Sequence, residues 1–267
     1  MSAVANPAAV HPLLRVRNLR RSFAGVHAVD GLDIEVAAGS VTGMIGPNGC
    51  GKTTSVNCIT GFDRSFTGQV DMAQTPLAGR TPDAIARGGL MRTFQAIRVF
   101  DTFTVLENVK LSMQSFDGTT VWQSLVRTSW FRRKEEEAEA RALELLELVG
   151  LLPKAGDMAG ELSYGQKKLL SLAGILMSDP RLVILDEPVA GVNPTRAMEI
   201  AEIIKSVNGR GTSFLIIEHN IPFVMRLCDS VIVMDRGKRL VQGTPEQIRN
   251  DPAVLEAYLG GAANVGD

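Results

Sequence analysis

The chain has 267 residues, a formal net charge of -1 at pH 7 and 45% hydrophobic residues, a globular composition that excludes a disordered chain. The near-neutral charge and an aromatic content of only 5% argue against a basic nucleic-acid coat or a base-stacking surface. The cysteines Cys50, Cys58 and Cys228 form no CxxC pair, and we expect them to be reduced thiols of a cytoplasmic protein.

The sequence predicts neither a membrane span nor a signal peptide. The longest apolar run, Leu169 to Met177, is interrupted by Ser171 and Gly174 and is shorter than the roughly 20 residues that a membrane helix needs. The first residues lack the charged region with which a secretory signal begins. We therefore expect a chain that reaches a membrane only through a partner.

Hydrophobic patterning predicts that strands and helices alternate along the chain. The expected strands are 14–17, 29–36, 41–45, 68–72, 90–94, 182–185, 213–217 and 230–234. One helix is expected directly after Lys52. Further helices are expected at 105–113, 134–149, 163–177, 195–207 and 221–227, and residues 114–133 are expected to form a surface insertion. The alternation of buried strands and helices in the last third is typical of a largely parallel α/β sheet.

A glycine-rich segment follows the expected strand 41–45. It reads GPNGCGKT and matches the pattern GxxxxGK[ST] between a strand and a helix, as a phosphate-binding loop requires. Backbone N–H groups of such a loop and the helix N-terminus face phosphate oxygens, Lys52 contacts the β- and γ-phosphates, and the Thr53 hydroxyl is a ligand of Mg²⁺. The expected nucleotide-binding residues are Gly46, Asn48, Gly49, Cys50, Gly51, Lys52, Thr53 and Thr54.

Two carboxylates end a second apolar strand. Asp186 and Glu187 directly follow residues 182–185. Open α/β sheets bind nucleotides at the carboxyl ends of their strands. We therefore expect Asp186 to hold Mg²⁺, directly or through water, and Glu187 to be the general base that polarises the attacking water.

A third segment, LSYGQ, runs from Leu162 to Gln166 and opens an expected helix. Taken alone, Ser163 followed three residues later by Gln166 is an ordinary capping box. After the two preceding motifs, the segment resembles the LSGGQ signature of the ATP-binding subunits of ABC transporters. In that family the signature contacts the γ-phosphate of ATP bound to the opposite subunit. Ser163, Gly165 and Gln166 would carry this role, whereas Tyr164 replaces a glycine.

The resemblance covers residues 13–259 and implies further roles. Gln95 fits the Q-loop glutamine that senses Mg²⁺ and faces the membrane subunits. His219 fits the switch histidine on the γ-phosphate, and Phe23 fits the aromatic residue that stacks on adenine. Residues 190–193 fit the D-loop, with Asn193 in place of the commoner aspartate. The implied cofactors are ATP and Mg²⁺, the implied catalytic residues are Glu187, His219 and Gln95, and the implied metal ligands are Thr53, Gln95 and Asp186.

The fold implied by the resemblance is α/β, a P-loop NTPase core with an antiparallel β subdomain and an inserted α-helical subdomain. The expected boundaries are 1–12 for an N-terminal tail, 13–95 and 181–260 for the core with the β subdomain, 96–180 for the helical subdomain, and 261–267 for a C-terminal tail.

Further segments are similar to importer ATPases of the branched-chain amino acid type, namely CITGF at 58–62, RTFQ at 92–95, VLENV at 105–109 and YLG at 258–260. Residues 168–170 and 173–176 depart from the arginine-rich helix of that type. The resemblance implies an ATPase subunit that energises import of a small solute, with branched-chain or related amino acids as first candidates. Implied partners are a second ABC ATPase, permease subunits and, indirectly, a solute-binding protein, at the cytoplasmic face of the inner membrane.

Two other functions stay open. An ATPase of lipid or lipopolysaccharide export shares the fold and has a similar C-terminal ending. A soluble ABC ATPase of DNA repair or translation would carry long coiled coils or a second ATPase unit, and the sequence has neither. We expect no nucleic-acid partner.

Cys50 leads to a chemical prediction. Lys52 and the start of a helix lie beside it and stabilise a thiolate, so we expect Cys50 in an open phosphate site to react faster than Cys58 or Cys228.

Overall fold

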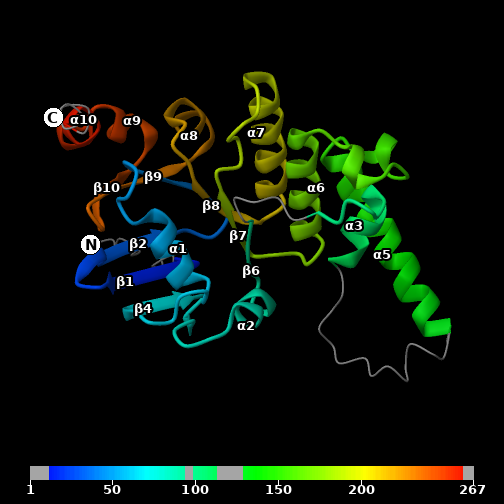
Figure 1. The fold of residues 1–267 in the computed structure, drawn as a ribbon, viewed down its shortest axis with the longest axis horizontal. Coiled ribbons are helices and arrows are strands. Elements are labelled where there is room, and N and C mark those ends of the chain that lie inside the picture. The colour runs from blue at the N-terminus through cyan, green and yellow to red at the C-terminus, as the bar shows by residue number, and fades with distance from the viewer. Residues whose placement is uncertain (1–11, 94–98, 113–128, 261–267) are drawn as a thin grey trace, which may run out of the picture. The chain divides into compact units, whose positions relative to one another are not determined.

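The computed structural model describes residues 12–93, 99–112 and 129–260 (Figure 1). Their contacts group them into two compact units. The first unit runs to Gly88 and resumes at Ser213, and the second runs from Gly89 to Thr212.

The first unit contains an antiparallel sheet in the order β2-β1-β4-β5. Its strands are β1 (Leu14–Phe23), β2 (Val26–Val36), β4 (Thr67–Met72) and β5 (Thr75–Pro76). Apolar side chains pair across it: Val16 faces Ile34 on β2 and Val70 on β4, and all three are buried. This alternation gives the sheet one buried face, as the sequence pattern predicts.

The first unit also contains four strands in the order β10-β9-β3-β8. They are β3 (Val41–Ile45), β8 (Ser213–Ile217), β9 (Ser230–Asp235) and β10 (Lys238–Gly243). Strand β3 runs parallel to β8 and β9, and β10 pairs antiparallel with β9. Every residue of β3 and β8 is buried, which explains their continuous apolar sequence.

Five helices belong to the described part of the first unit. They are α1 (Lys52–Ile59), α2 (Pro82–Arg87), α8 (Ile221–Leu227), α9 (Pro245–Arg249) and α10 (Pro252–Gly260). Helix α8 packs directly on β3, because a Cβ added to Gly43 would lie 2.5 Å from a methyl group of Val224.

The second unit is mainly helical around one parallel pair of strands, β6 (Leu90–Arg92) and β7 (Leu182–Asp186). Its helices are α3 (Val105–Leu111), α5 (Ser129–Leu148), α6 (Tyr164–Leu176) and α7 (Pro194–Asn208), with single turns η1 (Leu152–Lys154) and η2 (Ala159–Glu161). Helix α3 contacts both α5 and α6, and the buried side chains of Val109, Leu146 and Leu169 contribute to the unit's core.

The predicted α/β class is confirmed, with antiparallel and parallel strands and a helical region. Strands 41–45 and 213–217 and helix 221–227 have the predicted bounds, whereas β1 and β2 are longer than predicted. The predicted strand 90–94 ends at Arg92, and α5 begins at Ser129 rather than at residue 134. The short or half-exposed elements β5, β10, α2, α9 and α10 carry little periodicity and are not predicted by the sequence pattern.

Several predictions fall on residues outside the described ranges. They concern Gln95, the C-terminal tail and most of the N-terminal tail and of the insertion 114–133. The subdomain boundaries stay a prediction. Among the helices of the described residues, none combines the length and the apolar character that crossing a bilayer requires.

Candidate nucleotide site

The loop between β3 and α1 is held by backbone contacts that only glycine allows. A Cβ on Gly46 would lie 2.3 Å from the Met234 carbonyl oxygen, and one on Gly51 would lie 2.3 Å from the Ala28 carbonyl oxygen. Gly51 also has φ +101, which side chains rarely adopt. The Gly237 N–H donates to the Cys50 carbonyl over 3.0 Å. The glycines of the motif therefore fit the loop closely against β2 and the β9–β10 turn.

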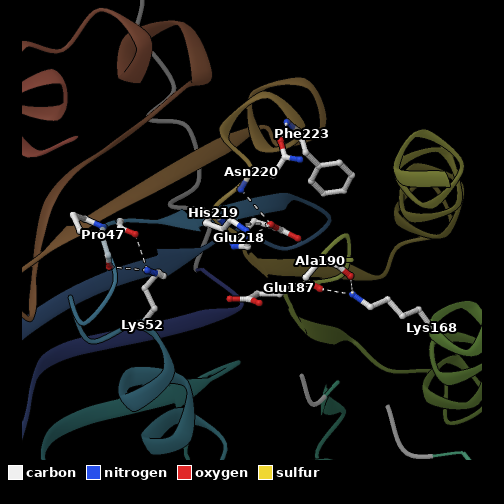
Figure 2. Close-up of polar contacts among 10 residues, drawn as sticks. Pro47, Lys52, Lys168, Glu187, Ala190, Glu218, His219, Asn220 and Phe223 are labelled. Atoms are coloured by element: carbon white, nitrogen blue, oxygen red, sulfur yellow. Dashed lines mark hydrogen bonds and ion pairs between the residues drawn. The ribbon is translucent and has the colours of Figure 1, made fainter. Parts of the chain in front are cut away.

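Lys52 lies in the first turn of α1, and its ammonium lies against the loop that precedes it. Its Nζ donates to the carbonyl oxygens of Gly46 over 2.7 Å and of Pro47 over 3.0 Å (Figure 2). Gly51 begins the helix without a side-chain cap, so the first N–H groups of α1 have no capping side chain. Uncapped N–H groups beside an ammonium suit an anion such as phosphate.

His219 lies at the same edge of the strands as the loop. Strands β3 and β8 are parallel, with Met44 opposite Ile217, so both chains leave the sheet on one side. The His219 side chain is 63% exposed. Beneath it, the buried Glu218 carboxylate accepts the backbone N–H groups of His219 and Asn220 over 3.1 and 3.3 Å (Figure 2). Glu218 thus fixes the backbone from which the histidine projects.

Phe23 ends β1 with an exposed ring. The Arg21 guanidinium lies 4.0 Å from the ring centroid and pairs with Asp63 over 2.6 Å. Partial burial would raise the pKa of Asp63, but hydrogen bonds from Arg21 and from the Ser65 N–H outweigh it and hold that pKa below its usual range. The Arg21 guanidinium therefore covers one face of the Phe23 ring in a cation–π contact, an arrangement that is compatible with an aromatic stacking surface.

In the second unit, Asp186 ends β7 in a buried ion pair. Its carboxylate lies 2.8 Å from the Arg92 guanidinium at the end of β6, and the two side chains are only 10% and 7% exposed. The Asp186 N–H also donates to the Thr93 hydroxyl over 3.0 Å. The sequence analysis gave Arg92 no role, although a charged residue at the end of a buried strand is a signal for such a partner.

Glu187 adopts a strained backbone conformation. Its φ is +51, in the left-handed region, which costs a non-glycine residue about 1–3 kcal/mol. Its carbonyl oxygen accepts hydrogen bonds from the Lys168 ammonium over 2.8 Å and from the Ala190 N–H over 3.2 Å. Strain of this kind concentrates at functional sites, which agrees with the predicted importance of Glu187.

The segment LSYGQ forms the capping box that its sequence allows. Ser163 Oγ accepts the Gln166 N–H over 3.3 Å, and Gln166 Oε1 accepts the Ser163 N–H over 2.9 Å. Tyr164 is exposed, and a Cβ added to Gly191 would lie 3.3 Å from its ring. The residue that departs from the LSGGQ pattern therefore lies beside the expected D-loop.

Asn193 ends that loop by capping α7. Its Oδ1 accepts the Arg196 N–H over 2.8 Å. Asparagine and aspartate are comparable N-caps, so the replacement of aspartate preserves the start of the helix.

The predicted residues fall into two groups. The first unit contains Phe23, the loop 46–53 and His219, and the second contains Asp186, Glu187 and the segment 163–166. Among the described residues, no cluster of three or more His, Cys, Asp or Glu forms a ready metal site. The Thr53 hydroxyl in the first unit and the Asp186 carboxylate in the second are each oxygen donors, the type of ligand that Mg²⁺ takes.

The cysteines differ from expectation in one respect. Cys50 is only 3% exposed, so the prediction of an openly accessible thiol is wrong: the side chain points inward, with Sγ 3.6 Å from Lys52 Nζ. Burial raises the pKa of both Cys58 and Cys228 to about 12, which agrees with their expected low reactivity.

A strand, a GxxxxGK[ST] loop and a helix, together with a strand that ends in two acids, define a P-loop nucleotide hydrolase. Comparisons with known proteins narrow the class. The model of the ABC transporter family matches residues 29–190, and the model of branched-chain amino acid ATP-binding cassette transporters matches residues 238–264.

Relatives match over almost the whole chain. The high-affinity branched-chain amino acid transport ATP-binding protein LivG of Salmonella typhimurium is 40% identical over 252 residues, covering 94% of this chain and 99% of LivG. BraF of Pseudomonas aeruginosa, which has the same description, is also 40% identical over 252 residues, with 94% and 99% covered. The ADP conformation of MJ1267, an ATP-binding cassette of an ABC transporter, has a TM-score of 0.81 at 35% identity, covering 93% of this chain and 99% of MJ1267. The chain belongs to the ABC transporter family as an ATP-binding subunit and is an ATPase.

Proposed function

We propose that this ATPase energises the uptake of branched-chain amino acids or closely related solutes. The observation that carries the proposal is the 40% identity to LivG and BraF over 94% of the chain. The match of residues 238–264 to the branched-chain amino acid type also supports it, in a segment that lies outside the match to the general ABC model.

The chemistry follows from the roles of the chain's own residues. Lys52 exchanges its two carbonyl partners for β- and γ-phosphate oxygens of ATP, and the uncapped N–H groups of α1 receive the remaining phosphate charge. Glu187 accepts the proton of the attacking water, and His219 and Gln95 contact the γ-phosphate and the water. Phe23 stacks on adenine. Thr53, Asp186 and Gln95 would hold Mg²⁺, which would supply positive charge against the phosphates.

The chain acts as one half of an ATPase pair. It contains one phosphate-binding loop and one segment of the LSGGQ type. Ser163 and Tyr164 are exposed at the start of α6, where Ser163, Gly165 and Gln166 can meet ATP held by a second subunit of the same or a related chain. ATP closes the pair, and hydrolysis releases it.

Exposed apolar residues in the second unit support contact with permease subunits in the membrane. Phe100, Phe103 and Met158 are 60%, 39% and 48% exposed. The centroids of the two phenylalanine rings lie 5.5 Å apart. Met158 forms an isolated antiparallel β-bridge with Thr104, the residue after Phe103. An apolar patch of this kind marks an interaction surface. The patch accounts for membrane attachment of a chain whose described helices include no span.

Reconstitution with the permease and solute-binding protein tests the proposal. In vesicles with MgATP, leucine, isoleucine or valine with the binding protein should stimulate hydrolysis, and the chain should sediment with membranes only when permease subunits are present. Phe100→Ser with Phe103→Ser should reduce sedimentation, whereas Leu255→Ser, an exposed apolar residue elsewhere, should not. Stimulation by lipid alone, or DNA binding at physiological salt, would contradict the proposal.

A further inference from the structure

We propose that Lys168 is a positioning residue that fixes the turn carrying Glu187 and thereby sets the orientation of the catalytic carboxylate. The inference rests on the proposed role of Glu187 as general base. It assigns a function to a residue outside the LSGGQ segment, at one of the positions where the sequence departs from the arginine-rich helix of similar importer ATPases.

The Lys168 ammonium contacts two backbone carbonyls of one turn. Its Nζ donates to the carbonyl oxygens of Glu187 over 2.8 Å and of Ala190 over 2.7 Å (Figure 2). An ammonium bound to two carbonyls of one turn makes charge-assisted hydrogen bonds at both ends of it. The distance between the two carbonyls is then fixed by a single cation.

The backbone hydrogen bonds within the turn are long, and part of its backbone is strained. The Ala190 N–H reaches the Glu187 carbonyl over 3.2 Å, and the Val192 N–H reaches the Val189 carbonyl over 3.3 Å. Glu187 has φ +51 and Gly191 has φ +72, so the segment takes the left-handed conformation twice. A strained non-glycine residue keeps its conformation only where its surroundings impose it. The Lys168 ammonium binds the Glu187 carbonyl directly and so contributes to this restraint.

The same face of α6 contacts the loop a second time. Tyr164 precedes Lys168 by four residues, which places both on one side of the helix. The Lys168 ammonium lies 5.3 Å from the centroid of the Tyr164 ring, and that ring lies beside Gly191. The helix that begins with the LSYGQ segment is thus tied to the Glu187 turn through a lysine and a tyrosine.

Replacing Lys168 therefore removes the hydrogen bonds to the Glu187 turn while Glu187 itself is unchanged. Methionine keeps the length and apolar stem of lysine but cannot donate. Arginine keeps a cation that can donate to two acceptors. Lys167 provides a matched control, because it is the adjacent lysine on the same helix and its Nζ pairs with Asp101 over 2.7 Å instead.

The experiment measures MgATP hydrolysis by the full chain with its partner ATPase for Lys168→Met, Lys168→Arg and Lys167→Met. Lys168→Met should lower kcat by about tenfold or more with KM for ATP nearly unchanged, since a misplaced base affects the chemical step rather than binding. Lys168→Arg should recover most of kcat, and Lys167→Met should keep the parental value. Thermal melting of each variant separates a loss of kcat from a loss of folded protein.

A double variant separates this inference from the proposed function. If Lys168 acts through Glu187, then Lys168→Met should have little further effect in a Glu187→Gln background, because residues that act as a unit are not additive. Equal kcat for Lys168→Met and Lys167→Met, or the same fold loss of kcat in both backgrounds, would overturn the inference. Parental activity of Glu187→Gln would overturn the role of Glu187 itself.

Discussion

The phosphate-binding loop of the first unit and the turn of the second unit that carries Asp186 and Glu187, here called the carboxylate turn, are stabilised in different ways. The loop is stabilised mainly by contacts between backbone atoms. Gly46 and Gly51 lie too close to backbone carbonyls to leave room for a Cβ, and the Gly237 N–H donates to the Cys50 carbonyl. The turn is held by side chains from distant segments, since Arg92 pairs with Asp186 and Lys168 binds the Glu187 carbonyl.

The difference determines how each region tolerates change. A loop whose conformation depends on close contacts of glycines should be destabilised when a single methyl group is added at the closest of these contacts. A turn specified by charged partners should fail when a distant cation is removed, although its own residues stay intact. The predictions below compare a change of each kind with a matched control.

The largest effect on folding is expected for Arg92→Ala. This change leaves Asp186 charged, buried and without its ion-pair partner, and breaking a buried pair on one side costs about 3–5 kcal/mol. Arg15→Ala removes the more exposed pair with Glu35 and should cost less than about 1 kcal/mol. Urea unfolding of the full chain measures both. Similar free energies of unfolding for the two variants would show that the carboxylate turn does not depend on Arg92.

A smaller effect is expected for alanine in the loop. Gly51→Ala combines φ +101 with a contact of 2.3 Å to the Ala28 carbonyl, whereas Gly49→Ala has φ +77 and no atom within 4 Å of its Cβ. We expect Gly51→Ala to lower the free energy of unfolding by more than about 2 kcal/mol and Gly49→Ala by about 1 kcal/mol. Equal losses in the free energy of unfolding for the two variants would contradict this expectation. They would show that the positive φ alone, and not the close contact with the Ala28 carbonyl, sets the cost of adding a Cβ to the loop.

The smallest effect concerns the thiols. Burial holds the pKa of Cys58 and Cys228 at about 12, so neither forms much thiolate at neutral pH. N-ethylmaleimide should label Cys50 first, slowly because it is 3% exposed, and MgATP should slow the reaction further. Cys50→Ser should stay active and resist inactivation. Peptide mapping identifies the labelled residue, and faster labelling of Cys58 or Cys228 would contradict the assignment.

The same difference explains which parts of the site can be predicted from sequence. The loop was predicted residue by residue, because a continuous motif encodes its backbone shape and β3 has the predicted bounds. The sequence also predicts that Asp186 and Glu187 lie at the end of an apolar strand, and β7 ends at Asp186.

The supports of the carboxylates could not be predicted. Arg92 and Asp186 are 94 residues apart in sequence, and Lys168 and Glu187 are 19 apart, so only the folded chain brings them together. Likewise, the inward orientation of Cys50 depends on packing that the motif does not record. Local motifs predict the groups that contact nucleotide, and long-range packing determines what holds them.

The most direct test of the account is ATP hydrolysis and ATP binding by Glu187→Gln compared with Lys52→Ala, each with the partner ATPase present. Loss of the general base should lower the hydrolysis rate by about 10²–10⁴ while ATP still binds and holds the ATPase pair together. Lys52→Ala should instead lose nucleotide binding, because it removes the ammonium that receives the phosphates. Size measurement with ATP distinguishes the two variants. A Glu187→Gln chain that hydrolyses ATP at the parental rate would contradict the account.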